Sequence, residues 1–470
     1  GNMTVSHLRK LFRPTSVAVI GASERKGSVG NLVMHNLLEG GFDGPIMPVN
    51  PKRRAVAGVL TYPDVASLPV IPDLAVVCTP PATVPKIIDE IGKHGTRAAI
   101  VLTAGLGATP ASDSSGTAQT EVLATARTYG MRLLGPNCLG LLVPGIGLNA
   151  SFAHLPALPG NIAFASQSGA MCTAVLDWAR ARGIGFSHFI SMGDALDTDF
   201  GDVLDYLGSD PGTRAILLYV ESIQERRAFM SAGRAASRNK PVLVIKAGRS
   251  DAGARAAQSH TGALAGSDAV YDAAFRRAGM LRVDTIEEIF AAVETLARAP
   301  KFPGDRLAIV TNGGGIGVMA VDRLAKMGGR LAEFSDTTMA ALDKVLPASW
   351  SHGNPADIIG DAPPERYAAA MRTVLAAKEA DAVLVMHAPT ATASSTAAAQ
   401  AVIDVARETK APVLANWVGQ EAVAPARKML RDAGVPTYDT PGEAIGAFMH
   451  LITYKRNQEM LTETPTSLPA

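Results

Sequence analysis

His260 is the side chain in this sequence whose surroundings best suit covalent chemistry. It stands between Ser259 and Thr261, in a stretch at residues 248–266 that is rich in glycine, alanine and serine and carries two arginines. One nitrogen of a neutral imidazole can act as a nucleophile while the other holds the proton. This composition predicts a mobile loop rather than a helix of ordinary stability. We therefore predict a loop that carries a reactive histidine to different partners; the alternative is a histidine that caps a helix or faces solvent.

A carboxylate that could orient this histidine ends a strand-like run earlier in the chain. Glu221 closes the apolar run at 215–221, and the next such run, at 240–247, leads into the histidine stretch. A carboxylate that accepts a hydrogen bond from one imidazole nitrogen fixes the tautomer and leaves the other nitrogen free. The other eight histidines lack such a setting, and no spacing of histidine, cysteine and carboxylate suggests a metal site.

Two turns of small residues could hold a phosphoryl group near that histidine. One contains Ser168 and Gly169 and the other contains Gly313 and Gly314, and each joins an apolar run to a helical pattern. Backbone N–H groups are left free at a helix start, and small residues let an anion approach them. Two related turns could therefore aim two helix N-termini at one phosphoryl group. The alternative is close packing of a helix on a strand.

A third turn, near the start of the chain, also suits a phosphate. Gly21, Gly27 and Gly30 lie between an apolar run and a helical pattern, although their spacing is not that of the dinucleotide fingerprint. The second apolar run ends near Lys52, where a site for NAD would place an acid. A lysine there favours a ribose that carries a phosphate, as in coenzyme A (CoA) or NADP. The alternative is a plain strand-to-helix turn.

Composition limits the classes of function. A length of 470 residues favours about three domains, and a formal net charge of +1 gives no global field for nucleic acid or an anionic membrane. The three cysteines have no paired spacing, no apolar run is long enough to span a membrane, and the short, mixed-charge stretch at 4–13 does not resemble a signal peptide. We expect a cytoplasmic protein.

The elements that must position these residues form three α/β units. Short apolar runs alternate with helical patterns, which predicts parallel sheets built from strand–helix–strand repeats. We expect a Rossmann-like domain at residues 4–145, followed by two flavodoxin-like domains at 146–300 and 304–455. Residues 456–470 are polar and end in a stretch rich in proline and threonine, which predicts a linker.

The second and third units repeat each other. The run at 307–311 corresponds to that at 162–166, and two later pairs of runs correspond in the same order. The copies differ at the residues of chemical interest. Ala388 stands opposite Glu221, and the third unit has no equivalent of the Ser-His-Thr-Gly sequence.

Several of these motifs together resemble those of the NDP-forming acyl-CoA synthetases, which include ADP-forming acetate–CoA ligases and are relatives of succinyl-CoA synthetase. The resemblance covers nearly the whole chain. The shared motifs are Gly21-Ala-Ser through Gly30, Cys78-Thr-Pro-Pro81, Gly135-Pro-Asn-Cys-Leu-Gly140, Ser166-Gln-Ser-Gly169, Tyr219-Val-Glu221, Ser259-His-Thr-Gly-Ala263 and Thr311-Asn-Gly-Gly-Gly315. The family implies a CoA-binding domain followed by two flavodoxin-like ligase domains.

The resemblance implies roles for individual positions. It implies that His260 is phosphorylated during turnover, that Glu221 orients it, and that the Ser168–Gly169 and Gly313–Gly314 turns hold the phosphoryl group. Ser-His-Thr-Gly, where succinyl-CoA synthetases have Gly-His-Ala-Gly, places the chain nearer the acetate-type enzymes and leaves the acid unassigned. The positions implied to contact CoA are Gly21, Ser23, Glu24, Arg25, Lys26, Lys52, Pro80, Thr103, Ala104 and Gly105.

One part of the family is not seen in these residues. We find no glycine-rich nucleotide lid and no ATP-grasp domain. We therefore expect ADP or ATP, with Mg²⁺, to bind on an ATP-grasp subunit or on a fused domain outside this sequence. The expected partners are that ATP-grasp unit, CoA, and a small carboxylic acid or its acyl phosphate, and we expect an oligomer.

These features predict an acid–thiol ligase that interconverts acyl-CoA plus phosphate and acid plus CoA through an acyl phosphate and a phosphohistidine. A second interpretation is a regulatory CoA-binding or acyl-CoA-binding module of a larger protein lysine acetyltransferase. The pairing of His260 with Glu221 argues against a purely sensory role. A third interpretation, an NADP oxidoreductase, gives no reason for the duplicated turns.

Overall fold

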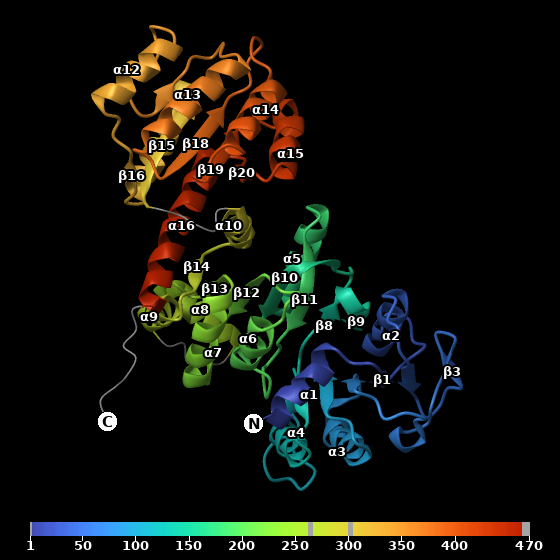
Figure 1. The fold of residues 1–470 in the computed structure, drawn as a ribbon. Coiled ribbons are helices and arrows are strands. Elements are labelled where there is room, and N and C mark those ends of the chain that lie inside the picture. Colours follow the sequence, from blue (N-terminus) through green and yellow to red (C-terminus); the bar gives the residue numbers. More distant parts are fainter. Residues whose placement is uncertain (1, 262–266, 299–303, 463–470) are drawn as a thin grey trace, which may run out of the picture. The chain divides into compact units, whose positions relative to one another are not determined.

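The computed structural model describes residues 2–261, 267–298 and 304–462 (Figure 1). The chain forms two compact units, Gly1–Asp284 (unit 1) and Thr285–Ala470 (unit 2), and each is described by itself. Unit 1 holds two large sheets and unit 2 holds one.

The first sheet of unit 1 is parallel and has the strand order β2-β1-β5-β6-β7. Alternate residues of its strands face two cores, as the two-residue period of a strand requires. Val76 and Ile100 pack towards α1 and α2, while Val77 and Val101 pack towards α3 and α4. The strands are β1 (Val17–Ile20), β2 (Ile46–Val49), β5 (Leu74–Val77), β6 (Ala98–Val101) and β7 (Arg132–Leu134), with a small hairpin of β3 (Ala55–Val56) and β4 (Val59–Leu60); the helices are α1 (Asn2–Phe12), α2 (Val29–Glu39), α3 (Val84–His94) and α4 (Ala118–Thr128).

The second sheet of unit 1 has the order β14-β13-β12-β10-β11-β8-β9. Its strands from β14 to β11 are parallel, and the β8–β9 hairpin adds an antiparallel edge. The strands are β8 (Gly140–Val143), β9 (Leu148–Ser151), β10 (Leu158–Ser166), β11 (Gly185–Ser191), β12 (Ala215–Val220), β13 (Val242–Lys246) and β14 (Leu281–Val283), and the helices are α5 (Gly169–Ala181), α6 (Phe200–Gly208), α7 (Arg226–Asn239), α8 (Asp251–Thr261) and α9 (Asp268–Arg277).

The β8–β9 hairpin spans the predicted boundary at residue 145. Leu141 and Leu142 of β8 pair with Ile190 and Phe189 of β11 and are buried, so the strand belongs to the second sheet. One continuous hydrophobic core runs from the first sheet through this hairpin into the second. Backbone pairing and burial therefore continue across the predicted boundary.

The loop predicted around His260 is wrong over residues 251–261, which form helix α8. Gly248 adopts a φ of +82°, and the Ser250 side chain accepts a hydrogen bond from the Gly253 N–H at 3.0 Å, as a helix cap does. Alanine has the highest helix propensity, and here it outweighs the glycine and serine. Residues 262–266 and the side chain of His260 lie outside the described residues.

Unit 2 is built on a parallel sheet of order β16-β15-β18-β19-β20, with β17 also paired to β15. Its two faces again bury alternate residues: Val383 and Val385 face one core, and Ala382 and Leu384 face the other. The strands are β15 (Arg306–Thr311), β16 (Arg330–Leu331), β17 (Ala356–Asp357), β18 (Ala382–His387), β19 (Val413–Trp417) and β20 (Thr437–Tyr438), and the helices are α10 (Ile286–Arg298), α11 (Gly314–Lys326), α12 (Asp336–Val345), α13 (Pro364–Ala377), α14 (Ser395–Ala406), α15 (Ala424–Asp432) and α16 (Pro441–Thr462).

Two helices lie at predicted domain boundaries. Helix α10, which is expected to close the domain at 146–300, groups with unit 2, where Thr295 shares a hydrogen bond with Tyr438. Helix α16 extends to Thr462, into the predicted linker, because Asn457 and Leu461 are buried there.

Candidate functional site

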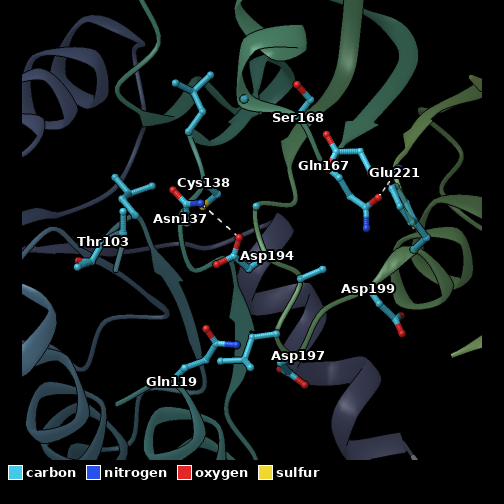
Figure 2. A pocket seen from close by; sticks show the side chains of 18 of the residues that line it. Thr103, Gln119, Asn137, Cys138, Gln167, Ser168, Asp194, Asp197, Asp199 and Glu221 are labelled. Atoms are coloured by element: carbon cyan, nitrogen blue, oxygen red, sulfur yellow. Dashed lines mark hydrogen bonds between the residues drawn. The ribbon is translucent and has the colours of Figure 1, made fainter. Parts of the chain in front are cut away.

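A cavity of about 1390 Å³ lies within unit 1 (Figure 2). Loops from both sheets line it, among them the ends of β5 and β6, the loop before β8, the β10–α5 turn, the β11–α6 loop and the end of β12. The carboxyl ends of parallel strands are the usual place for ligands in such folds. The cavity is therefore the candidate site.

The cavity brings together six of the predicted site residues: Pro80, Thr103, Ala104, Ser168, Gly169 and Glu221. Within the part of the chain that the structure describes, other predicted residues do not line it: Gly21, Ser23, Glu24, Arg25, Lys26, Lys52 and Gly105. Gly313 and Gly314 belong to unit 2. The CoA-side and phosphate-side predictions thus meet in one space, apart from the N-terminal turn.

The N-terminal turn is tightly built around its glycines. Gly21 has a φ of +96°, and a Cβ on Gly30 would lie 2.0 Å from the carbonyl oxygen of Gly21. The start of α2 therefore rests directly on the strand end, and a larger residue at position 30 would separate them. Val29, in the first turn of α2, reaches the cavity lining.

A second loop is tied to this turn by one amide. Asn50 donates to the Ala22 carbonyl at 2.8 Å and accepts from the N–H groups of Lys52 and Arg53 at 2.8 and 3.1 Å. Arg25, Lys26 and Lys52 are all exposed, as cations that meet a soluble phosphate should be.

Glu24 lies at the same turn but has a structural contact. Its carboxylate accepts a hydrogen bond from the Ala57 N–H at 2.6 Å, which ties the turn to the β3–β4 hairpin. This contact alone accounts for a carboxylate among the basic residues.

The predicted phosphate turn at residues 166–169, here named the first turn, is held by its own side chains. The Ser166 hydroxyl donates to the Ser168 carbonyl at 3.0 Å and accepts from the Ser168 N–H at 3.0 Å. The Ser168 hydroxyl then caps α5 by accepting from the Met171 N–H at 3.2 Å. Gly169 is exposed, and a Cβ there would meet nothing within 4 Å. The start of α5 is thus open to an anion.

Gln167 is a site residue that the sequence analysis missed. Its side-chain oxygen accepts from the N–H groups of Glu221 and Ser222 at 2.6 and 3.0 Å, and its nitrogen donates to the Ser222 carbonyl at 2.9 Å (Figure 2). Gln167 therefore fixes the backbone at the end of β12, where Glu221 follows the strand. An amide at the same place in both repeats, Gln167 and Asn312, was the available signal.

The neighbour of Glu221 on β13 is a buried lysine. Lys246 pairs with Val220, is 6% exposed, and places its ammonium 4.5 Å from the centre of the Tyr271 ring. Burial lowers the pKa of Lys246, whereas the charge of Glu221 acts in the opposite direction. The end of β12 and β13 is thus a charged corner directly before Gly248 and α8.

The cavity also contains thiols and carboxylates that were not predicted. Burial raises the pKa of Cys78 to about 12 and that of Cys138 still further, so neither thiol is a nucleophile near neutral pH. Asp197 accepts from Arg132 at 3.0 Å and from the Leu133 N–H at 2.8 Å. Asp199 caps α6, and burial raises its pKa to about 6. Asp194 lines the same wall.

Unit 2 contains a second turn, at residues 311–314, with the same local geometry. The Thr311 hydroxyl donates to the Gly313 carbonyl at 2.9 Å and accepts from its N–H at 3.0 Å. Asn312 accepts from the Ala388 N–H at 2.8 Å and donates to the Ala388 carbonyl at 2.9 Å. Gly314 and Gly315 are exposed at the start of α11. The predicted duplication therefore extends to the hydrogen bonds of the turn.

Among the described residues, no group of three or more histidine, cysteine or carboxylate side chains could hold a metal ion. Within the same ranges, no helix combines the length and the apolar character needed to cross a membrane.

Comparison with known proteins places each part of the chain in a described family. Residues 15–144 match a CoA binding domain, residues 159–296 a succinyl-CoA ligase like flavodoxin domain, and residues 307–457 a ligase-CoA domain. All three matches agree with the predicted fold class.

Two relatives and one solved structure are similar over nearly the whole chain. Acetate–CoA ligase (ADP-forming) I of Archaeoglobus fulgidus is 39% identical over 96% of this chain, which spans only 64% of that relative. The alpha subunit of acetate–CoA ligase (ADP-forming) I of Pyrococcus furiosus is 38% identical over 96% of this chain and 98% of the subunit. The dinucleotide forming acetyl-coenzyme A synthetase 1 of Ca. Korarchaeum cryptofilum, solved in complex with phosphate and ADP, matches with a TM-score of 0.88 and 36% identity over 97% of this chain and 98% of that one.

Proposed function

Since the chain belongs to the family of ADP-forming acetate–CoA ligases, we propose that it carries the CoA-ligase part of such an enzyme. Acyl-CoA and phosphate give CoA and an acyl phosphate, which passes its phosphoryl group to His260 and releases the acid; each step is reversible. The observation that carries this proposal is the cavity, because it joins residues predicted for CoA to residues predicted for phosphate.

CoA binds as a substrate across the carboxyl edge of the first sheet. The exposed side chains of Arg25, Lys26 and Lys52 suit its phosphates, and the N-terminal turn offers free N–H groups at the start of α2. Pro80, Thr103 and Ala104 line the path from that edge into the cavity. The cavity would then hold the thiol end.

The phosphoryl group binds at the first turn. The start of α5 supplies free N–H groups, and its positive dipole end suits an anion. His260 accepts the phosphoryl group and Glu221, fixed through its backbone by Gln167, orients the ring. The second turn, with Gly313 and Gly314, is proposed as another helix start suited to a phosphoryl group.

The nucleotide and Mg²⁺ bind on an ATP-grasp partner, either a separate subunit or a fused domain. Two observations support a partner: one relative is named as an alpha subunit, and another is a longer protein of which this chain spans 64%. The partner passes a phosphoryl group between His260 and ADP, and the acid is a small carboxylic acid.

Acetyl phosphate radiolabelled in phosphorus tests the proposal. Purified wild type should acquire an acid-labile label, and His260→Asn should acquire none. With unlabelled acetyl phosphate and CoA, both proteins should form acetyl-CoA, because that step does not use the histidine. Equal labelling of both proteins, or no acetyl-CoA from wild type, would contradict the proposed function.

A further inference from the structure

We propose that Asp194 is the general base that takes the proton of the CoA thiol when the acyl group moves between phosphate and sulfur. This inference rests on the proposed function and assigns a residue to its acyl-transfer step. Asp194 lines the cavity and belongs to the loop between β11 and α6 (Figure 2).

The backbone around Asp194 is fixed on both sides. The Met192 N–H donates to the Ser166 carbonyl at 2.8 Å, which ties the loop to the first turn. The Asp194 N–H donates to the Pro136 carbonyl at 2.9 Å, which ties it to the loop before β8. A Cβ on Gly193 would lie 2.3 Å from the Pro136 oxygen, so the two loops touch without space for a side chain. Asp194 thus has a set position between the phosphate side and the CoA side.

Hydrogen bonds connect the side chain of Asp194 to the loop that is predicted to bind CoA. Asn137 donates from its amide to the Asp194 carboxylate at 3.3 Å, and its backbone N–H donates to the Thr103 carbonyl at 3.0 Å (Figure 2). The Thr103 hydroxyl in turn donates to the Thr79 carbonyl at 2.7 Å. A chain of direct hydrogen bonds therefore links this carboxylate to the strand ends where CoA is expected.

Other ionisable groups of the cavity suit the role less well. The two thiols are themselves weak acids, Arg127 is a cation, and Asp197 and Asp199 are occupied by Arg132 and by the helix cap. Glu221 is proposed to orient His260, and Glu225 directly precedes α7 on a loop without a tie to the CoA side among the described contacts. The only side-chain hydrogen bond found for the Asp194 carboxylate in the described chain comes from Asn137, which leaves three lone-pair positions. The groups that line the cavity with Asp194 are Cys78, Cys138, Arg127, Asp197, Asp199, Glu221 and Glu225.

The environment strengthens Asp194 as a base. Burial raises its pKa, and the hydrogen bond from Asn137 offsets this in part. This burial is partial, because Asp194 is an exposed residue that lines the cavity, so a bound thiol can reach it. A raised pKa brings the carboxyl nearer to the operating pH, where general bases are most effective.

The step balances as follows. The S–H proton of CoA moves to a carboxylate oxygen of Asp194 as sulfur forms its bond to the carbonyl carbon of the acyl phosphate. The bond between that carbon and the phosphate oxygen breaks, and phosphate leaves towards the start of α5. In the reverse direction the protonated Asp194 returns the proton to the departing thiolate.

Asp194→Asn tests the assignment in the full chain with acetyl phosphate and CoA. Removing a general base typically costs about 100-fold to 10,000-fold in rate. We expect a fall in that range in kcat for acetyl-CoA formation, with the KM for CoA changed by less than about threefold. The deficit should shrink as pH rises towards the thiol pKa of about 8.5, because CoA then arrives as thiolate. A purely structural effect would give a deficit that does not change with pH, and that result would overturn the assignment.

Two controls separate the outcomes. Glu225→Gln removes a charge from the same cavity and should stay within about threefold of wild type; an equal loss in both variants would point to charge alone and sink the proposal. Labelling of His260 by acetyl phosphate needs no thiol, so Asp194→Asn should still be labelled. A wild type that forms no acetyl-CoA refutes the proposed function, whereas an active wild type matched by Asp194→Asn refutes only the role of Asp194. If Asp194→Asn does not fold, Asp194→Ser is read by the same pH criterion.

Discussion

The first turn in unit 1 and the second turn in unit 2 share one construction and differ in what surrounds it. In each, a hydroxyl on the last strand residue, Ser166 or Thr311, bonds the residue two positions on, and an amide bonds the end of the next strand. The first turn leads to Glu221, whereas the second leads to Ala388. The scaffold proposed to bind a phosphate is thus duplicated, but the carboxylate proposed to orient a histidine is not.

The neighbouring positions differ in the same sense. Val220 and Lys246 in unit 1 correspond in register to His387 and Trp417 in unit 2. His387 is fully buried, shares hydrogen bonds with the Tyr367 hydroxyl at 2.7 Å and the Ser395 hydroxyl at 2.9 Å, and stacks on Trp417. In unit 2 the polar residues at these positions therefore form a closed internal network. In unit 1 the corresponding positions form a charged corner at the ends of β12 and β13.

Glu221→Ala gives the first turn the residue of the second and should have the largest effect. The Gln167 amide bonds the backbone of residue 221, so the turn keeps its geometry while the carboxylate is lost. We expect labelling of His260 by acetyl phosphate to slow about 100-fold or more, the scale of a lost acid–base partner. Quench-flow labelling measures this rate, with Glu225→Gln as the control.

The reciprocal variant sharpens the comparison. Ala388→Glu places a carboxylate beside the second turn, and it should not restore labelling to Glu221→Ala. Restoration would show that the two turns are interchangeable and would contradict the asymmetry described above.

His387 should make the stability of unit 2 depend on pH. Burial lowers its pKa to about 4, against about 6.5 in the unfolded chain, so the unfolded state binds the extra proton first. The contribution is complete above pH 6.5 and is lost as pH falls to about 4, by an amount on the order of 3 kcal/mol. Urea unfolding between pH 4 and 7 measures it.

The control replaces the titrating ring. His387→Gln keeps a polar side chain without a proton to bind in this range, and it should flatten the pH dependence of unit 2 by that amount. Unit 1 has valine at the corresponding position, so its unfolding should not respond to this change. An unaltered pH profile in His387→Gln would refute the role of the ring.

The sequence predicted the parallel sheets, the repeat and the two turns, because these depend on periodicity and on residues close together in the chain. Gln167, Asn137 and Asp194 were missed because their roles depend on contacts between segments up to 57 residues apart. No spacing rule reports such contacts. Three of the ten residues predicted to contact CoA, Pro80, Thr103 and Ala104, line the cavity for the opposite reason, since strand ends of a parallel sheet meet at one edge.

Helix α8, which replaces a predicted loop, and two helices at predicted domain boundaries show which physical terms compete. Helix α8 forms because alanine propensity and the Ser250 cap outweigh the glycine at position 253. Helix α10 has one apolar face, and its sequence does not say which neighbouring unit will cover that face. Similarly, the sequence at the end of α16 is polar and does not indicate that Asn457 and Leu461 are buried there.

Replacing Asn312 and Gln167 by alanine should show how far the different burial of these two side chains changes their contribution to stability, since both make the same kind of hydrogen bonds. Asn312 is 4% exposed, so Asn312→Ala leaves the Ala388 N–H and carbonyl without this partner at a site that is largely covered, at a cost of about 2–3 kcal/mol. Gln167 faces the cavity, where water can replace it, and Gln167→Ala should cost about 1 kcal/mol. Urea unfolding compares the two.

Activity should rank these variants in the other order. Gln167→Ala frees the backbone at Glu221 and should slow His260 labelling more than Asn312→Ala does. If both variants lose the same stability and the same labelling rate, the amides serve only the shared turn and not the orientation of Glu221.

Substitutions at the helix caps of the two turns should have the smallest effect on stability, and they exchange the capping residues of the two turns most directly. Ser168 caps α5 through the Met171 N–H, whereas Gly313 begins α11 without a side-chain cap. Ser168→Ala should cost about 1 kcal/mol, and Gly313→Ser should gain a few tenths of a kcal/mol. Gly313 has extended backbone angles that serine adopts freely, and its nearest neighbour, Ile316, would lie 3.3 Å from the new Cβ and is only partly buried. Thermal unfolding at matched protein concentration measures both shifts. A loss on Gly313→Ser would mean that the second turn needs glycine for close approach of a ligand or of Ile316, and not because a cap is simply absent.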